Sequence, residues 1–270
     1  MLNRFRHIVE EMRGLIDDSR SASFLLAVSG GVDSMCLADM WLRCFGADSC
    51  AIAHCNFNLR GEDSDGDEAL VTGWAQEHGV RLHKVSFDTI RYASENGVSI
   101  EMAARELRYR WFGELCSGYG YDALVTAHHA DDNAETLLMH LIRGTGLKGL
   151  GGISPVLGNR IRPMLTVTRE EVLLFLESYH ISYVEDSSNK EDAFLRNRLR
   201  HHVMPLLKKE NPRLSESLTQ MALGLREDEA LLTSRLIGET LSVLLTHALV
   251  LYALRNQPAA PSFLELHGCS

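Results

Sequence analysis

Short apolar runs alternate with longer amphipathic segments along the first half of the chain. The apolar runs have the length of strands and the amphipathic segments show helical spacing, which predicts a parallel sheet with helices on both faces. We therefore expect a doubly wound, parallel, five-stranded α/β sheet. The expected strands are 23–28, 51–55, 81–87, 121–127 and 161–165, and the expected helices are 1–20, 33–45, 65–79, 99–116 and 131–143.

The pattern changes in the second half of the chain. Residues 144–158 are rich in glycine, which predicts a loop. From Thr168 onward the spacing is mainly helical, with expected helices at 168–179, at 192–208 and, with breaks, at about 213–254. We divide the chain into an α/β domain over 1–210, a helical extension over 211–254 and a loose tail over 255–270.

The run from Leu236 to Leu254 is nearly long and apolar enough to cross a membrane. It contains Gly238, Glu239 and His247 and lacks a flanking basic cluster, so we expect a buried helix instead. The segment from Met1 to Arg20 is charged and amphipathic, unlike a signal peptide. We therefore expect a cytoplasmic protein with no membrane partner.

The bulk composition excludes several classes of protein. Hydrophobic residues make up 45% of the chain and charged residues 23%, which is typical of a soluble globular protein. The net charge of -9 argues against a protein that coats nucleic acid without specificity, although it permits a local basic patch. The six cysteines include no C-x-x-C pair, so neither a zinc ribbon nor a disulfide framework is indicated.

An expected strand, a Gly-Gly turn and the start of a helix meet at Ser29-Gly30-Gly31-Val32-Asp33-Ser34. Paired glycines let the backbone approach a ligand closely, and the free N–H groups of the next helix point at a phosphate. The pattern is neither the lysine-bearing P-loop nor the dinucleotide fingerprint. Because a carboxylate repels bare phosphate, we expect Asp33 to hold a metal ion on that phosphate. An ordinary strand-to-helix turn is the alternative interpretation.

Titratable side chains gather after the fourth expected strand, from His128 to Asp132. The carboxyl ends of parallel strands share one edge of a sheet, so this segment is expected beside the Gly-Gly turn. Asp132 can share a magnesium ion with Asp33. The alternative for Asp131 is a purely structural role as the N-cap of the following helix. A zinc site is the rival interpretation for the adjacent histidines, but it lacks a partner cysteine and the HExxH spacing.

Two basic segments lie further along the chain. Arg196 and Arg200 lie one helical turn apart on one face, and Arg198 points elsewhere. Taken alone, this run is typical of a solvated or salt-bridged face, with a contact to a phosphate backbone as the alternative. Arg143 and Lys148 flank glycines in a segment that either folds over a nucleotide or nucleic acid or is a plain surface loop.

Together these motifs resemble the PP-loop of N-type ATP pyrophosphatases and, more narrowly, the tRNA(Ile)-lysidine synthases. The chain departs from the narrower family at Phe57, where the family pattern has His. The resemblance covers about residues 22–210. Besides the turn at 29–34, it rests on His54–Gly61, His128–Thr136, Arg143–Leu147, Ile161–Leu165, Glu185–Asn189 and Arg196–Arg200, in that order.

The resemblance implies a Rossmann-like fold of the adenine nucleotide alpha hydrolase kind and a two-step ligation that uses ATP and Mg²⁺. AMP is transferred from ATP to the carbonyl oxygen of the wobble cytidine of a tRNA(Ile) with anticodon CAU, and pyrophosphate leaves. Free lysine then displaces AMP, which gives lysidine and changes the codon read from AUG to AUA. The alternatives are a PP-loop tRNA thiolase, which needs cysteines spaced for a cluster or relay, and a non-catalytic adenine-nucleotide-binding protein.

The resemblance also assigns roles to residues of this chain. Asp33, His128 and Asp132 are the expected catalytic residues, with Asp33 and Asp132 as metal ligands. ATP is expected to bind Ser29, Gly30, Gly31, Val32, Asp33, Ser34, His54 and Arg105, and tRNA is expected to bind Arg143, Lys148, Arg196, Arg198 and Arg200. The group that deprotonates lysine is not identified, and the oligomeric state is left open, a homodimer included. Long family members carry further C-terminal domains, which the stretch after 254 does not resemble.

Overall fold

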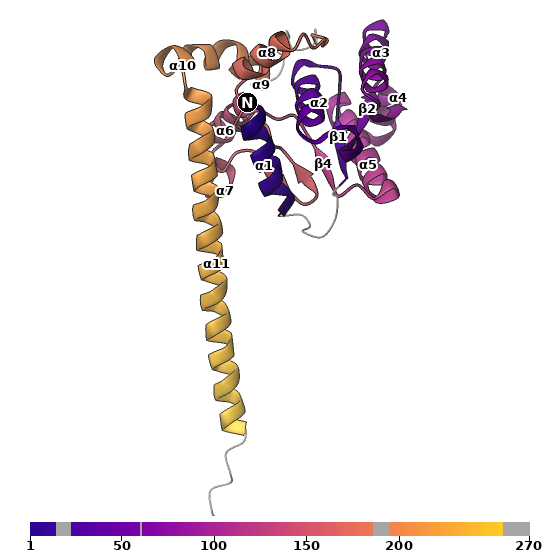
Figure 1. Cartoon of the computed structure of the whole chain (residues 1–270). Helices are drawn as coiled ribbons and strands as arrows, with labels where there is room; N and C mark the ends of the chain where they lie inside the picture. The colour runs from indigo at the N-terminus through magenta and orange to yellow at the C-terminus, as the bar shows by residue number, and fades with distance from the viewer. Residues whose placement is uncertain (15–22, 60, 186–194, 256–270) are drawn as a thin grey trace, which may run out of the picture.

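The computed structural model describes residues 1–14, 23–59, 61–185 and 195–255, the backbone alone at 62–63 and 236–255. Within these residues the strands form one six-stranded sheet in the order β3-β2-β1-β4-β6-β5. Figure 1 labels β1, β2 and β4 of this sheet. The first five strands in this order are parallel, and β5 runs antiparallel to β6. The strands are β1 Phe24–Ala27, β2 Cys50–Asn56, β3 Arg81–Ser86, β4 Ala123–Val125, β5 Val156–Leu157 and β6 Arg160–Ile161.

The expected parallel sheet is confirmed, with one strand more than the sequence indicated. The extra strand, β5, lies inside the glycine-rich segment 144–158 and forms a short hairpin with β6. Gly158 makes the connection with φ +58°, a conformation that favours glycine. A strand of two residues is too short to leave an alternating pattern, so periodicity could not reveal it.

Helices cover both faces of the sheet, as the alternating pattern predicted. On one face Leu26 and Ile52 pack with helices from the N-terminus and from residues 169–178. On the other face Leu25 and Leu124 pack against Phe112. The helices of this α/β part are α1 Leu2–Gly14, α2 Val32–Phe45, α3 Glu62–Glu77, α4 Thr89–Asn96, α5 Ile100–Tyr119, α6 Ala130–Arg143, α7 Leu147–Leu150 and α8 Arg169–Ser178.

The C-terminal part is helical, but its helices differ from the expected ones. The expected helix at 192–208 is divided into α9 Leu195–Arg198, a π-helical turn η3 Leu199–Val203 and α10 Met204–Glu210, and residues 192–194 lie outside the described residues. The breaks expected within 213–254 are wrong, because α11 is one helix from Leu214 to Arg255. The helix contains two glycines, Gly224 and Gly238, and each costs only about 1 kcal/mol, too little to stop a long helix.

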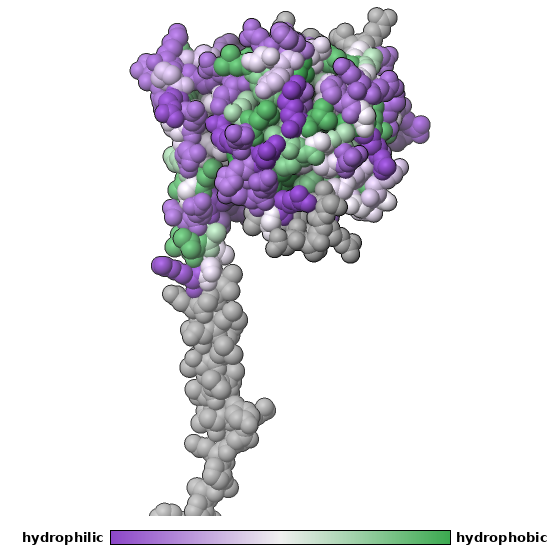
Figure 2. All heavy atoms as spheres, viewed as in Figure 1, coloured by the Kyte–Doolittle hydropathy of each residue, from purple (hydrophilic) through white to green (hydrophobic). Residues whose placement is uncertain are grey.

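The helix α11 packs along α6 and then runs away from the sheet (Figure 1). The face in Figure 2 is mostly hydrophilic over the α/β part. Apolar patches lie among these hydrophilic residues and along the upper part of α11. The expected burial of Leu236–Leu254 concerns side chains outside the described set and stays a prediction. Of the helices as far as they are described, none is long and apolar enough to cross a membrane.

Candidate active site

The turn between β1 and α2 is shaped as an anion cradle. Gly30 has φ +91°, and a Cβ added there would lie 3.3 Å from the carbonyl oxygen of Asp67. This position therefore requires glycine, both for its backbone angle and for the close approach of α3. Gly31 is the N-cap of α2 and supplies no side-chain cap to the first amides of the helix. Those N–H groups, at the positive end of the helix dipole, are suited to bind phosphate.

Two serines brace the cradle from inside. The hydroxyl of Ser34 donates to the carbonyl oxygen of Gly31 at 2.9 Å and accepts from the amide of Ser29 at 3.1 Å. Outside the turn, the amide of Val184 donates to the carbonyl oxygen of Gly30 at 2.9 Å. The cradle is therefore held in shape without a ligand. Val184 leads into the Glu185–Asn189 motif, of which residues 186–189 lie outside the described residues, as does Arg60 of the earlier motif.

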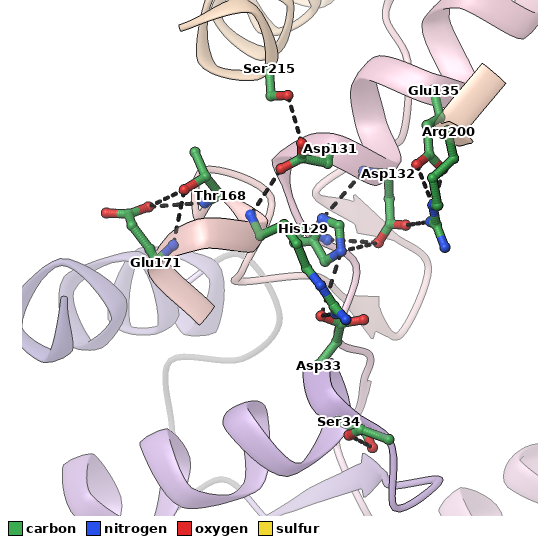
Figure 3. Close-up of polar contacts among 12 residues, drawn as sticks. Asp33, Ser34, His129, Asp131, Asp132, Glu135, Thr168, Glu171, Arg200 and Ser215 are labelled. Atoms are coloured by element: carbon green, nitrogen blue, oxygen red, sulfur yellow. Dashed lines mark hydrogen bonds and ion pairs between the residues drawn. The ribbon is translucent and has the colours of Figure 1, made fainter. Parts of the chain in front are cut away.

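His129 joins the carboxylates that follow β1 and β4. Its Nδ1 accepts the amide of Asp132 at 3.3 Å, and its own amide donates to Oδ2 of Asp132 at 3.0 Å, which forms a capping box at the start of α6. Since Nδ1 accepts, Nε2 is the ring nitrogen that carries a proton. Nε2 lies 3.5 Å from Oδ1 of Asp33 and 3.6 Å from Oδ2 of Asp132 (Figure 3). The N-cap is thus His129, and the N-cap alternative for Asp131 is wrong.

The carboxylate of Asp33 lies at the mouth of the cradle, in the first turn of α2. Besides its contact with His129, it forms an ion pair with the guanidinium of Arg169 on α8. The side chain of Asp33 is still 32% exposed, so a ligand can reach it. Asp33 and Asp132 therefore approach the same edge of the sheet from two helices, as the strand order predicted.

The two carboxylates on the first turns of α6 are held by arginines. Arg196 places Nη2 2.8 Å from Oδ1 of Asp132 and Nε 2.7 Å from Oε2 of Glu135. Arg200 places Nη2 3.2 Å from Oδ1 of Asp132 and Nε 2.6 Å from Oε1 of Glu135. Burial alone would raise the pKa of Asp132, but the charge of Arg196 and the hydrogen bond from the amide of His129 outweigh it and lower the pKa. Asp132 is therefore ionised at neutral pH.

His128 has the opposite electrostatic character. Its Nδ1 lies 3.0 Å from the hydroxyl of Thr126. Burial lowers the pKa of His128 to about 4, even though Asp132 favours the charged ring. The imidazole is therefore neutral at neutral pH, and it can act as a hydrogen-bond donor or acceptor but does not carry a positive charge to a phosphate.

Two residues expected to bind ATP lie outside this network. His54 is 2% exposed, and its Nδ1 contacts the carbonyl oxygen of Val28 at 2.9 Å, just before the cradle. Burial lowers the pKa of His54, although the bond to Val28 opposes this, so a neutral ring supports the turn from beneath. Arg105 is exposed on α5, with its guanidinium 5.2 Å from the centre of the Tyr109 ring.

The residues expected to contact tRNA fall into two groups. Arg143, Lys148 and Arg198 are exposed. Arg196 and Arg200 share one face, as their spacing predicted, but their guanidiniums contact Glu135. The structure thus favours a salt-bridged face for these two arginines, and the contact of all five with tRNA stays a prediction.

Sequence reasoning missed three contributors to this site. Glu135 stands one helical turn after Asp132, a spacing that places both on one face and was a usable signal. Arg169 pairs with Asp33 across 136 positions of the chain, and no local pattern reports such a contact. The third is Lys208, which forms an ion pair with Asp131.

The donor set suits magnesium better than zinc. Throughout the described part of the chain, no group of three His, Cys, Asp or Glu side chains is arranged to hold a metal ion. Zinc normally requires three or four such ligands, and Nδ1 of His129 is already used in the helix cap. Mg²⁺ needs only one or two carboxylates when phosphate oxygens and waters complete its shell. Asp33 and Asp132 supply two carboxylates beside the phosphate cradle.

Comparisons with known proteins identify what the chain is similar to. The pattern of the PP-loop domain family matches residues 4–207. The tRNA(Ile)-lysidine synthase of Bacteroides thetaiotaomicron is 42% identical over 260 residues, which are 96% of this chain and 59% of that protein. The synthase of Porphyromonas gingivalis strain ATCC 33277 is 47% identical over 220 residues, which are 81% of this chain and 47% of that protein. The chain thus spans about half the length of the curated relatives it matches.

A solved structure shares the fold. The U34-tRNA thiolase NcsA from Methanococcus maripaludis, with its [4Fe-4S] cluster, superposes with a TM-score of 0.65 at 20% sequence identity. The superposition covers 83% of this chain and 78% of that chain. This likeness supports the doubly wound architecture.

Proposed function

This chain belongs to the PP-loop domain family, and we propose that it ligates lysine to the wobble cytidine of a tRNA(Ile) with anticodon CAU. The proposed reaction consumes ATP, releases pyrophosphate and AMP, and leaves lysidine. One observation carries the proposal: the phosphate cradle at 29–34 opens beside two carboxylates, Asp33 and Asp132, that His129 brings together. The relatives named tRNA(Ile)-lysidine synthase, at 41–47% identity, supply the choice of substrate.

In the first step, the carbonyl oxygen of the cytosine bonds to the α-phosphorus of ATP while the bond to pyrophosphate breaks. The uncapped amides of α2 would hold the departing pyrophosphate, because they offer N–H donors and a positive dipole end. Mg²⁺, held by Asp33 and Asp132, would offset charge on the phosphates. His128, neutral at physiological pH, would donate a hydrogen bond to the α-phosphate instead of an ionic contact.

In the second step, the lysine ammonium first gives a proton to a neighbouring carboxylate or histidine of the site. Its free amine then bonds to the activated carbon, and AMP leaves with the former base oxygen. Lysine arrives as a cation and needs carboxylates to bind it. Asp132 and Glu135 already bind cationic groups, namely the guanidiniums of Arg196 and Arg200. We place the lysine ammonium at this pair, where it would share or displace the contacts of Arg196.

The remaining assignments rest on the same proposal. Residues 1–210 would form the catalytic domain and 211–254 a helical extension, and the protein would act in the cytoplasm, where tRNA, ATP and free lysine meet. Arg143, Lys148 and Arg198 are exposed and are proposed as contacts to the tRNA backbone. Arg196 and Arg200 would act on tRNA only if their carboxylate partners release them.

Mass spectrometry of nucleosides tests this function. Unmodified tRNA(Ile) with anticodon CAU is incubated with the protein, ATP, Mg²⁺ and lysine, then digested. We expect lysidine, formed together with AMP and pyrophosphate and dependent on lysine. Asp33→Asn should lower pyrophosphate release by at least about 100-fold, as expected for the loss of a charged group at the reacting phosphates. Asp48→Asn, which removes an exposed carboxylate just after α2, is the matched control and should retain full activity.

Other outcomes would each contradict a different part of the proposed function. Lysine-dependent release of AMP and pyrophosphate without lysidine would reject lysine ligation to tRNA. Binding of ATP without any release of pyrophosphate would indicate a nucleotide-binding protein. Sulfur in the product of a parallel incubation that contains a sulfide donor would indicate a thiolase. Near-normal pyrophosphate release by Asp33→Asn would reject the role of Asp33.

A further inference from the structure

Three arginines beside the proposed site rest on aromatic rings. The guanidinium carbons of Arg105 and Arg160 lie 5.2 Å and 4.7 Å from the centre of the Tyr109 ring. The guanidinium carbon of Arg108 lies 5.0 Å from the centre of the Phe57 ring. Arg105 and Arg108 are exposed, and Arg160, Tyr109 and Phe57 are half-buried. We call these five residues the α5 arginine surface.

The α5 arginine surface is cationic without carboxylate partners. Among the described residues, none of its three guanidiniums forms an ion pair, whereas Arg169, Arg196 and Arg200 all bind carboxylates. In a chain of net charge -9, such a set of unneutralised arginines is a specific feature. A phosphate can therefore reach these guanidiniums without displacing a protein carboxylate.

A buried arginine behind the surface adds to its positive field. Arg162 is 7% exposed, and its Nε has no hydrogen-bond partner within the described residues. Burial lowers the pKa of Arg162, and the nearby charges of Arg160 and Arg105 lower it further. Arg162 also acts on His128, since its charge contributes to the lowered pKa of that ring. Arg162 therefore lies within electrostatic range of both the α5 arginine surface and His128.

The surface lies on the face of the sheet that α5 covers. Phe57 comes directly after β2, and Arg160 pairs in register with Leu124 of β4, the strand that leads to His128. The helix α5 covers the face of Leu25 and Leu124 and carries Tyr109 above it. The surface thus combines residues of α5 with one residue after the end of β2 and one at the start of β6.

We propose that the α5 arginine surface binds the single-stranded anticodon loop, next to the nucleotide that is modified. Guanidiniums on rings keep their N–H edges free for phosphates, and partly exposed rings allow bases to stack, the combination that single-stranded RNA requires. This inference rests on the proposed function for its choice of RNA. It supplies contacts that Arg196 and Arg200 cannot make while they hold Asp132 and Glu135.

Binding of the full chain to an unmodified anticodon stem-loop of tRNA(Ile), titrated at several salt concentrations, tests the proposal. Arg108→Ala and Arg160→Ala should each weaken binding about fivefold or more and reduce the salt slope by about 0.7, the value for one phosphate contact on a single strand. Arg160→Lys keeps the charge, so its affinity for the stem-loop should lie between those of the wild type and Arg160→Ala. Affinity for ATP and the melting temperature should stay as in the wild type.

Arg110→Ala is the matched control, because Arg110 is exposed on the same helix and lies 5.5 Å from another ring, that of Tyr92, outside the surface. It should bind the stem-loop as the wild type does. Unchanged affinity and salt slope in Arg108→Ala and Arg160→Ala would overturn the inference, as would an equal loss in Arg110→Ala or no binding by the wild type. A wild type that binds through these arginines but forms no lysidine would reject the proposed function and retain the surface.

Discussion

Two neighbouring residues of the site have their pKa values shifted for different reasons. His128 loses its charge because burial lowers its pKa to about 4. Asp132 keeps its charge because His129 and Arg196 outweigh the effect of burial on its pKa. A fixed anion beside a neutral imidazole separates the roles of the two groups, with Asp132 suited to cations and His128 to hydrogen bonds.

The pKa of His128 predicts how stability depends on pH. The ring takes up a proton near pH 6.5 when unfolded and only near 4 when folded, so the unfolded state binds more protons between these values. The free energy of unfolding should therefore fall as the pH drops from about 6.5 to about 4, by up to about 3 kcal/mol from this group. Urea unfolding at a series of pH values measures the slope. His128→Asn should flatten it, and an unchanged slope in the variant would contradict the assignment.

At the scale of elements, one buried carboxylate, that of Asp131 on α6, contacts three other helices. Asp131 accepts the amide of Arg169 from α8 and the hydroxyl of Ser215 from α11, each at 2.9 Å. It also forms an ion pair with Lys208 of α10. Asp131 therefore fixes α8 and the C-terminal helices against α6, and Arg169 of α8 forms its ion pair with Asp33.

Removal of this charge should loosen the joint between helices. Asp131→Asn should lower the free energy of unfolding by about 2 to 4 kcal/mol, because it leaves Lys208 without its partner and turns one acceptor into a donor. Ser215→Ala removes a single hydrogen bond and should cost about 1 kcal/mol. Thermal and urea unfolding of the two variants provide the comparison. Equal losses of stability in Asp131→Asn and Ser215→Ala would show that Asp131 does not hold the helices together.

The sequence predicted what depends on local pattern. The parallel strands and the turn at 29–34 were found because apolar runs and glycine pairs are visible within a few residues. Helix α4 was missed although Asp88, which accepts from the amide of Arg91 at 3.1 Å, and Gly97 in the left-handed conformation are ordinary end signals. The pairing of Asp33 with Arg169 was out of reach, because it depends on how α8 packs and not on any spacing.

At the scale of the whole molecule, the arginines of this acidic chain fall into two groups with different partners. Arginines near the carboxylates of α6 are neutralised, whereas those of the α5 arginine surface are not. The first set lies at the start of α6, beside the cradle, and the second lies on the face of the sheet that α5 covers. In the proposed function, the unneutralised arginines would guide an RNA base towards the phosphate site, while the net charge of -9 would limit non-specific association with nucleic acid.

The central claim is that the base oxygen of the tRNA attacks ATP in front of the cradle and later leaves with AMP. A tRNA(Ile) labelled with ¹⁸O at the C2 carbonyl of the wobble cytidine tests this directly. The AMP formed with ATP, Mg²⁺ and lysine is collected and weighed by mass spectrometry. The account predicts one ¹⁸O atom in each AMP and none left at that carbon of the product. Unlabelled AMP, with the label retained in the tRNA, would contradict it.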